Sequence, residues 1–173
     1  MRFEKVTKER YFKDCGYTDK FGDDLLIGCE EEYNDIELPK RATKGSAGYD
    51  FFAPFDINLQ PGETMIVPTG IRWVATVDNS DILYDIALYL YPRSGLGFKY
   101  LMGLANTVGI IDSDYFQSDN EGHIMAKIVN NGNKPIDIKK GQGFVQGIIS
   151  VYYKVDDDET VEQRNGGFGS SDK

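Results

Sequence analysis

Two short segments of this chain combine residue types that could carry out a reaction. The first, Gly109–Tyr115, joins an apolar run to the carboxylates of Asp112 and Asp114 and ends in an aromatic ring. The second, Pro92–Lys99, reads as a turn with a guanidinium group, a hydroxyl group and glycine amides that an anion can approach closely. A carboxylate combined with such a cradle indicates chemistry on a phosphate compound, which needs a positioned water and neutralised oxygens.

Other catalytic chemistries find less support in the sequence. His123 is the only histidine, which removes any serine or cysteine nucleophile mechanism that relies on a second imidazole, and we expect His123 to be structural. Cys15 and Cys29 lie in one polar segment without histidine or cysteine partners nearby. This spacing supports neither a zinc site nor a disulfide framework, so we expect free thiols.

The composition limits the possible partners. With 173 residues, 40% of them hydrophobic, the chain can bury one core and needs no second domain. Its net charge of −9 argues against nucleic-acid binding but allows a small phosphorylated ligand with a divalent cation. No apolar run could span a bilayer and the N-terminus has no apolar signal core, so we expect a cytoplasmic protein without a membrane partner.

The elements that must position these segments are predicted to be strands. From Pro39 onward, short β-branched or aromatic runs alternate with turn signals, which predicts an all-β barrel or jelly roll. The clearest predicted strands cover residues 65–68 continuing through 71–77, residues 82–90, and residues 145–153.

Two segments depart from the strand pattern. Residues 13–35 lack steady alternation and predict a surface insertion with a short helix, while the glycine-rich tail predicts a mobile arm. We therefore expect one β domain over residues 1–160 and a flexible C-terminal arm over residues 161–173.

Five separated motifs occur in one linear order: Ala47–Asp50, Pro92–Gly95, Gly109–Asp112 with Tyr115, Gly141–Gln146, and Arg164–Ser171. Together they resemble the five motifs of the trimeric dUTP diphosphatases (dUTPases), over a span from about Leu38 to Ser171. The resemblance implies a β jelly roll that forms a homotrimer, with active sites shared between subunits and closed by a C-terminal arm. It also implies Mg²⁺-assisted hydrolysis of dUTP to dUMP and pyrophosphate by water attack on the α-phosphorus.

The resemblance assigns the base and sugar contacts to the third motif. Asp112 would orient and deprotonate the attacking water, and Tyr115 would pack beneath deoxyribose and leave no room for a 2′-hydroxyl group. Asn106, with the backbone of Gly109 and Ile111, would read the edge of uracil. Groups shaped for uracil would be left unpaired against cytosine, which discriminates strongly.

The phosphate contacts fall on the second and fourth motifs. Ser94 and Gly95 would contact the phosphate chain, and Arg93 would serve either the phosphates or a subunit interface. Gln146 matches the glutamine of the fourth motif. The arginine or lysine that often precedes this glutamine by three positions is Gly143 here, so the fourth motif departs from the family pattern.

The fifth motif would act as a lid. By resemblance, Arg164 would clamp the terminal phosphate, Phe168 would stack on uracil, and Ser170 and Ser171 would bond γ-phosphate oxygens. Magnesium is implied by the triphosphate itself, and Asp50 would either contact the waters of that metal or fix a turn.

Two alternatives remain open at this point. A dCTP deaminase of the same fold would need a glutamate where Lys127 stands. A nucleotide-gated regulatory protein with a protein partner would explain the N-terminal insertion and the extra residues 116–121. The favoured interpretation is that both segments are solvent-exposed additions without such a role.

Overall fold

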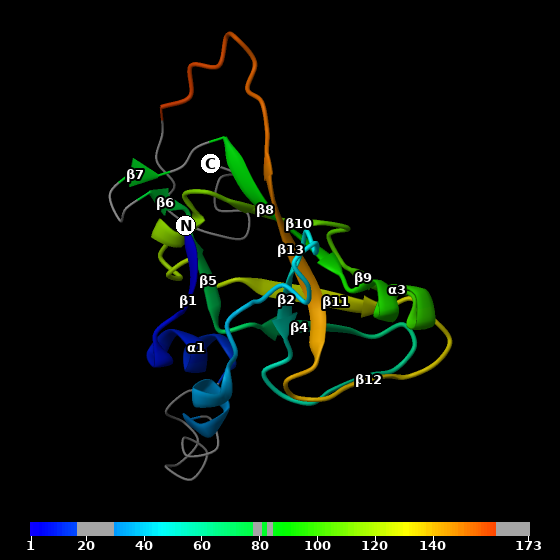
Figure 1. Cartoon of the computed structure of the whole chain (residues 1–173). Helices are drawn as coiled ribbons and strands as arrows, with labels where there is room; N and C mark the ends of the chain where they lie inside the picture. The colour runs from blue at the N-terminus through cyan, green and yellow to red at the C-terminus, as the bar shows by residue number, and fades with distance from the viewer. Residues whose placement is uncertain (17–29, 78–80, 83–84, 162–173) are drawn as a thin grey trace.

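Figure 1 shows the computed structural model of the chain, which describes residues 1–16, 30–77, 81–82 and 85–161. The elements in chain order are β1 (Arg2–Lys5), α1 (Lys8–Asp14), β2 (Tyr49–Phe52), β3 (Ile57–Leu59), β4 (Thr64–Pro68), β5 (Ile71–Val74), β6 (Thr76–Val77), β7 (Asp81–Ile82), β8 (Ile86–Pro92), α3 (Ser94–Tyr100), β9 (Met102–Leu104), β10 (Gly109–Asp112), the 3₁₀ helix η1 (Tyr115–Gln117), β11 (Met125–Asn130), β12 (Ile136–Ile138) and β13 (Gly143–Val151). Residues 30–35 form one further helical stretch. Within the described residues, no helix is long and apolar enough to cross a membrane.

The predicted all-β class is confirmed. The largest sheet has the strand order β10-β8-β13-β2, and a second has the order β4-β11-β9. Smaller pairs join β1 to β5, β12 to β3, and β6 to β7, and the pairings among the described strands are antiparallel. These sheets enclose one hydrophobic core in the jelly-roll manner expected from the sequence.

The core forms because strand residues alternate between an inner and an outer face. In β11, Ala126 and Ile128 are buried, whereas their neighbours Met125 and Lys127 face outward. Leu88 and Leu90 of β8 are buried against the same core. Each of the buried isoleucine and leucine side chains contributes about 1.5–3 kcal/mol. The alternation therefore fixes the register and leaves the outward-facing residues available for a site.

The boundaries of the predicted strands differ from those observed. The predicted strand 71–77 is divided into β5 and β6, and the predicted strand 82–90 is interrupted because Asp85 takes a positive φ of 67°, so β8 begins at Ile86. The last strand starts two residues earlier than predicted, at Gly143, and ends at Val151.

The turn predicted for Pro92–Lys99 is wrong, because most of this segment forms the helix α3. Gly95 and Gly97 have low helix propensity, which concealed the helix in the sequence. Burial of Leu96 holds the helix against the core, and Leu101 ends it in a left-handed conformation with φ of 55°. Tertiary packing has here overridden local preference.

The N-terminal residues join the core more closely than the sequence indicates. Strand β1 pairs with β5, and Val6 and Tyr11 are fully buried beside it. The described ends of the predicted insertion, residues 13–16 and 30–35, are exposed or half-buried. Residues 13 and 14 end helix α1, and residues 30–35 are helical. Residues 17–29 lie outside the described part of the chain.

His123 ties helix α1 to the core, in keeping with the structural role expected for it. Its side chain is fully buried, and its Nε2 accepts a hydrogen bond of 2.8 Å from the amide of Gly70. Its Nδ1 lies 2.6 Å from Oδ2 of Asp14. Because Nε2 accepts a hydrogen bond, the proton of the ring is on Nδ1, and the Nδ1–H group donates a hydrogen bond to the carboxylate of Asp14. The imidazole is therefore neutral.

This arrangement predicts a pH dependence of stability. Burial lowers the pKa of His123 from its ordinary value of 6.5, and Arg10 acts in the same direction, whereas Asp14 and Glu121 raise it. Since burial dominates, the unfolded chain binds more protons than the folded chain once the pH falls below 6.5. The contribution of His123 to stability is therefore fully present above this pH and is lost as the pH falls further.

Nuclear magnetic resonance of the untagged, ¹⁵N-labelled protein tests this directly, because the chain has a single histidine. We expect the Nδ1–H tautomer and an imidazole that remains neutral below pH 6.5. A titration midpoint above 6.5, or the opposite tautomer, would contradict the assignment. The melting temperature followed from pH 8 to pH 5 gives the accompanying loss of stability.

Candidate active site

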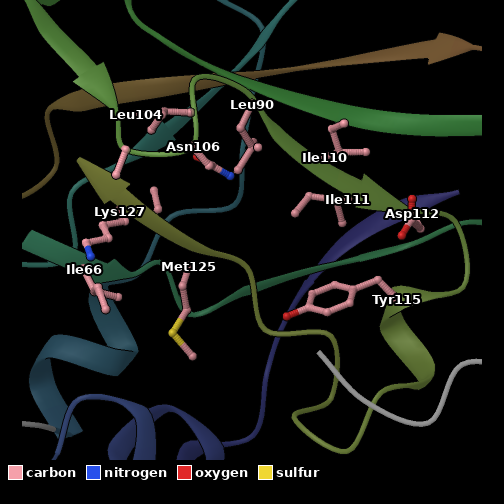
Figure 2. A pocket seen from close by; sticks show the side chains of 13 residues that line it. Ile66, Leu90, Leu104, Asn106, Ile110, Ile111, Asp112, Tyr115, Met125 and Lys127 are labelled. Carbon is pink, nitrogen blue, oxygen red and sulfur yellow. The ribbon is translucent and has the colours of Figure 1, made fainter. Parts of the chain in front are cut away.

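A pocket of about 640 Å³ opens beside strands β10, β11 and β4 (Figure 2). It is lined by Ile66, Leu90, Leu104, Ala105, Asn106, Gly109, Ile110, Ile111, Asp112, Tyr115, Met125, Ala126 and Lys127. The five residues that the sequence assigns to the third motif are all in this set. Strand alternation could also have found Met125 and Lys127, which lie two positions apart and face the same side of β11.

A tight hairpin forms one end of the pocket. Thr107 has a positive φ of 67°, and the amide of Val108 donates to the carbonyl of Asn106 at 2.7 Å. The chain then enters β10, where Gly109 faces Leu90 of β8. A β-carbon on Gly109 would lie 3.1 Å from Cβ of Leu90, so a glycine lets the two strands approach and leaves the hairpin beside the pocket.

Asp112 and Tyr115 lie together at the other end of the pocket, as Figure 2 shows. Asp112 ends β10 and is partly exposed. Tyr115 begins η1 and is only 7% exposed. Its hydroxyl group accepts a hydrogen bond of 2.8 Å from Nδ2 of Asn120 and donates one of 3.2 Å to the carbonyl of His123. With the hydroxyl group bonded to the following loop, the aromatic ring forms the wall of the pocket.

The residues after Tyr115 are not simply a solvent-exposed addition, which was the favoured interpretation of residues 116–121. Ser118 is 5% exposed and Asn120 is 9% exposed. Arg72 donates a hydrogen bond of 3.0 Å to the carbonyl of Phe116. Sequence reasoning missed the supporting role of these residues, because no local pattern reveals that Asn120 bonds the hydroxyl group of Tyr115.

A second group of predicted residues gathers at the adjoining ends of β2, β8 and β13. Nε of Arg93 lies 3.3 Å from Oδ1 of Asp50, and Asp50 stands opposite Gln146 in the register of β2 and β13. Nε2 of Gln146 donates to the carbonyl of Pro92 at 3.4 Å. A β-carbon on Gly48 would lie 2.6 Å from Oε1 of Gln146, so this glycine makes room for the glutamine side chain.

The departure at Gly143 has a structural reason. A β-carbon at this position would lie 2.7 Å from Nη1 and 3.1 Å from Cδ of Arg93. Any larger residue would therefore require the side chain of Arg93 to shift. With glycine here, the guanidinium group keeps its ion pair and remains 42% exposed.

Ser94 and Gly95 begin helix α3 next to this second group and are both exposed. Amides in the first turn of a helix have no acceptor within the helix. None of Arg93, Ser94, Gly95 or Gln146 lines the pocket that contains Asp112. The described part of a single chain thus holds the predicted phosphate contacts and the predicted base and sugar contacts as two groups.

The fifth-motif residues Arg164, Phe168, Ser170 and Ser171 lie outside the described residues. The chain that leads to them leaves the sheets after β13, as Figure 1 shows. Tyr153 and Val161 along this stretch are 95% and 86% exposed.

Comparison with known proteins shows the family. The dUTPase family matches residues 34–172. The deoxyuridine 5′-triphosphate nucleotidohydrolase of Lactococcus lactis is 39% identical over 139 residues, which cover 79% of this chain and 88% of that protein. The crystal structure of dUTPase from Streptococcus mutans superposes with a TM-score of 0.63 and 29% identity, covering 90% of this chain and 99% of that one.

A dUTPase of Staphylococcus aureus phage phi11 shares the fold, with a TM-score of 0.58, 20% identity, and coverage of 74% of this chain and 92% of that one. At this identity the likeness concerns the fold alone. The family match and the Lactococcus lactis relative extend over most of the sequence and include the motifs that form the pocket. The chain therefore belongs to the dUTPase family.

Proposed function

We propose that the protein hydrolyses dUTP to dUMP and pyrophosphate. The observation that carries this proposal is the meeting of Asp112, Tyr115 and Asn106 in one pocket of a dUTPase-family chain. A carboxylate, an aromatic wall and a polar hairpin are the groups needed to activate water, hold a deoxyribose and read a base. The relative from Lactococcus lactis is named for the same reaction.

In the proposed reaction, Asp112 accepts a proton from a water molecule that attacks the α-phosphorus. A bond forms between the water oxygen and phosphorus, the bond from phosphorus to the α,β-bridging oxygen breaks, and pyrophosphate leaves with that electron pair. Ser94 and the amide of Gly95 bond the phosphate chain, and Gln146 supports them from β13. No covalent intermediate with the protein is needed, because positioning and charge neutralisation supply the catalysis.

Selectivity for the substrate follows from the two ends of the pocket. The ring of Tyr115 fills the space that a 2′-hydroxyl group would need, so UTP is rejected. Asn106 and the backbone of Gly109 and Ile111 bond the edge of uracil, and cytosine would leave these groups unpaired. A deaminase is not favoured, because Lys127 occupies the wall of the pocket where that reaction needs a carboxylate.

The active unit that we propose is a homotrimer. The phosphate contacts and the base and sugar contacts form two groups on one chain, and sharing between subunits would combine them around one nucleotide. Ile66 and Ile110 border the pocket and are 56% and 59% exposed, which leaves apolar surface for a neighbouring copy to cover. The C-terminal arm would then close the shared site, with Arg164, Phe168, Ser170 and Ser171 on the nucleotide.

The residues present fit a magnesium ion that arrives on the triphosphate. Among the described residues, no three histidine, cysteine, aspartate or glutamate side chains are grouped to hold a metal ion. Asp50 would reach the metal through water, since its carboxylate already pairs with Arg93. When bound, Mg²⁺ neutralises phosphate oxygens. A structural Mg(II) ion is described for the phage phi11 dUTPase.

The activity is tested by incubating the purified protein with Mg²⁺ and each of dUTP, dCTP, dTTP and UTP. We expect pyrophosphate from dUTP, with dCTP and UTP at least about 100-fold poorer, because cytosine leaves polar groups unpaired and ribose clashes at C2′. The reaction with dTTP shows how far the pocket excludes a 5-methyl group. No ammonia is expected from dCTP. Ammonia from dCTP, or no product from any nucleotide, would reject the hydrolase.

The role of Asp112 is tested by Asp112→Asn. The amide keeps the shape of the side chain but cannot accept the proton, so kcat should fall by about 10²–10⁴ while binding of a non-hydrolysable dUTP analogue persists. Asp114→Asn is the matched control, since Asp114 does not line the pocket, and it should keep kcat within about threefold. Equal effects of the two variants would remove Asp112 as the base.

Sharing of the site between subunits is tested by mixing two inactive variants. Asp112→Asn removes the base, and Ser94→Asp places a negative charge where the phosphates bind. If each site takes Asp112 and Ser94 from different copies, every mixed trimer contains one intact site, and random assembly restores about a quarter of wild-type activity. Mixed trimers that stay as inactive as the separate variants would show that each chain builds its own site.

A further inference from the structure

The ring of Tyr115 is held from behind by a short loop, residues 118–123. Asn120 bonds the hydroxyl group of Tyr115 and also accepts a hydrogen bond of 3.1 Å from the amide of Gly122. The carbonyl of His123 accepts the hydroxyl proton of Tyr115 at 3.2 Å. A displacement of this loop would therefore displace the wall of the pocket.

The loop has little freedom of its own. Glu121 and Gly122 both take left-handed conformations, with φ of 61° and 70°. A β-carbon on Gly122 would lie 2.4 Å from Cα of Phe116 and 2.8 Å from the carbonyl oxygen of Tyr115. The loop thus folds directly back onto η1, and a contact on its outer side acts on the ring through a few tightly packed atoms.

The N-terminal segment, residues 1–16, forms hydrogen bonds with the outer side of the loop. The carboxylate of Glu121 accepts hydrogen bonds from the amide and the hydroxyl group of Thr7, at 2.8 and 2.7 Å. Asp14 holds the ring of His123 at 2.6 Å, and Nε of Arg10 donates to the same Asp14 oxygen at 2.8 Å. The N-cap residue of helix α1, Thr7, and its last residue, Asp14, therefore contact two of the last three residues of the loop.

The family match includes Glu121 and His123 but not the N-terminal residues that contact them. The family match begins at residue 34, so the segment that holds the loop lies outside it. These contacts also join residues far apart in the chain, because the residue numbers differ by 114 for Thr7 and Glu121 and by 109 for Asp14 and His123. They are a feature of this chain that the assigned motifs do not include.

We propose that the N-terminal segment positions Tyr115 and thereby sets the discrimination between deoxyribonucleotides and ribonucleotides. Asp14 and Thr7 are positioning residues, because they act on the ring through His123 and Glu121 and not by touching the substrate. The inference rests on the proposed function, in which the ring excludes a 2′-hydroxyl group. Loosening the loop gives the ring room to retreat and admits ribose, while the chemistry at Asp112 is unaffected.

The test compares kcat/KM for dUTP with kcat/KM for UTP in Glu121→Ala and Asp14→Ala. Loss of these hydrogen bonds should lower the dUTP preference by about threefold to tenfold, mostly through better use of UTP, with kcat for dUTP within about twofold. Glu9→Ala is the matched control, an exposed carboxylate on α1 that should leave the preference unchanged. Asp14→Asn keeps an acceptor for His123 and should restore most of the preference that Asp14→Ala loses.

Amide hydrogen exchange follows the loop without any nucleotide. Both alanine variants should speed exchange at residues 121–123 and leave β13 unchanged. Faster loop exchange with an unaltered dUTP preference, or unaltered exchange in Glu121→Ala, overturns the inference even though dUTP is hydrolysed. Absence of dUTP hydrolysis by the wild type overturns the proposed function instead. If Asp14→Ala fails to fold, Glu121→Ala still tests the inference, because the hydrogen bonds between Glu121 and Thr7 lie at the surface.

Discussion

The register of β8 between β10 and β13 is the constraint on which the described site depends. Leu90 faces Gly109 on one side and Gly147 on the other, so two glycines flank the same buried leucine. This register places Asp112 of β10 at the pocket and Gln146 of β13 beside the end of β8. A slip of one residue would turn every side chain of a strand to the opposite face, which would bury the carboxylate and expose the core.

Charge at the site is arranged locally, against the acidic character of the whole chain. The net charge of −9 would repel a triphosphate at long range, yet Arg93 stands in the second group and Lys127 on the wall of the pocket. The carboxylate of Asp50 pairs with the guanidinium group of Arg93 and holds it in place. The same carboxylate partly offsets the positive charge of Arg93. A cation carried by the substrate suits such a surface, because it supplies charge that the protein does not have to keep in its empty state.

The sequence predicted well those features that depend on short stretches. The third motif could be located because its hairpin, strand and aromatic residue occupy about ten consecutive positions, and the strand alternation that places them is local. The helix α3 could not be predicted, since two glycines oppose a helix that only the burial of Leu96 makes favourable. The hydrogen bond between Asp14 and His123 could not be predicted either, because no pattern within one segment reveals which distant segment it contacts. The fifth motif lies outside the described residues, so its place in the site remains a prediction.

The link between the N-terminal segment and the core depends on a property that few side chains have. The buried site between Asp14 and Gly70 needs a group that donates to a carboxylate and accepts from a backbone amide at the same time. Neutral imidazole meets both needs without adding a charge to the core, whereas a lysine could only donate and a carboxylate could only accept. The charge of Asp14 is compensated by Arg10 on the same helix, so neither partner is left unpaired. His123 therefore lets an added segment be attached to the core beside Tyr115 without an unsatisfied polar group, and its neutral form is the condition for that attachment.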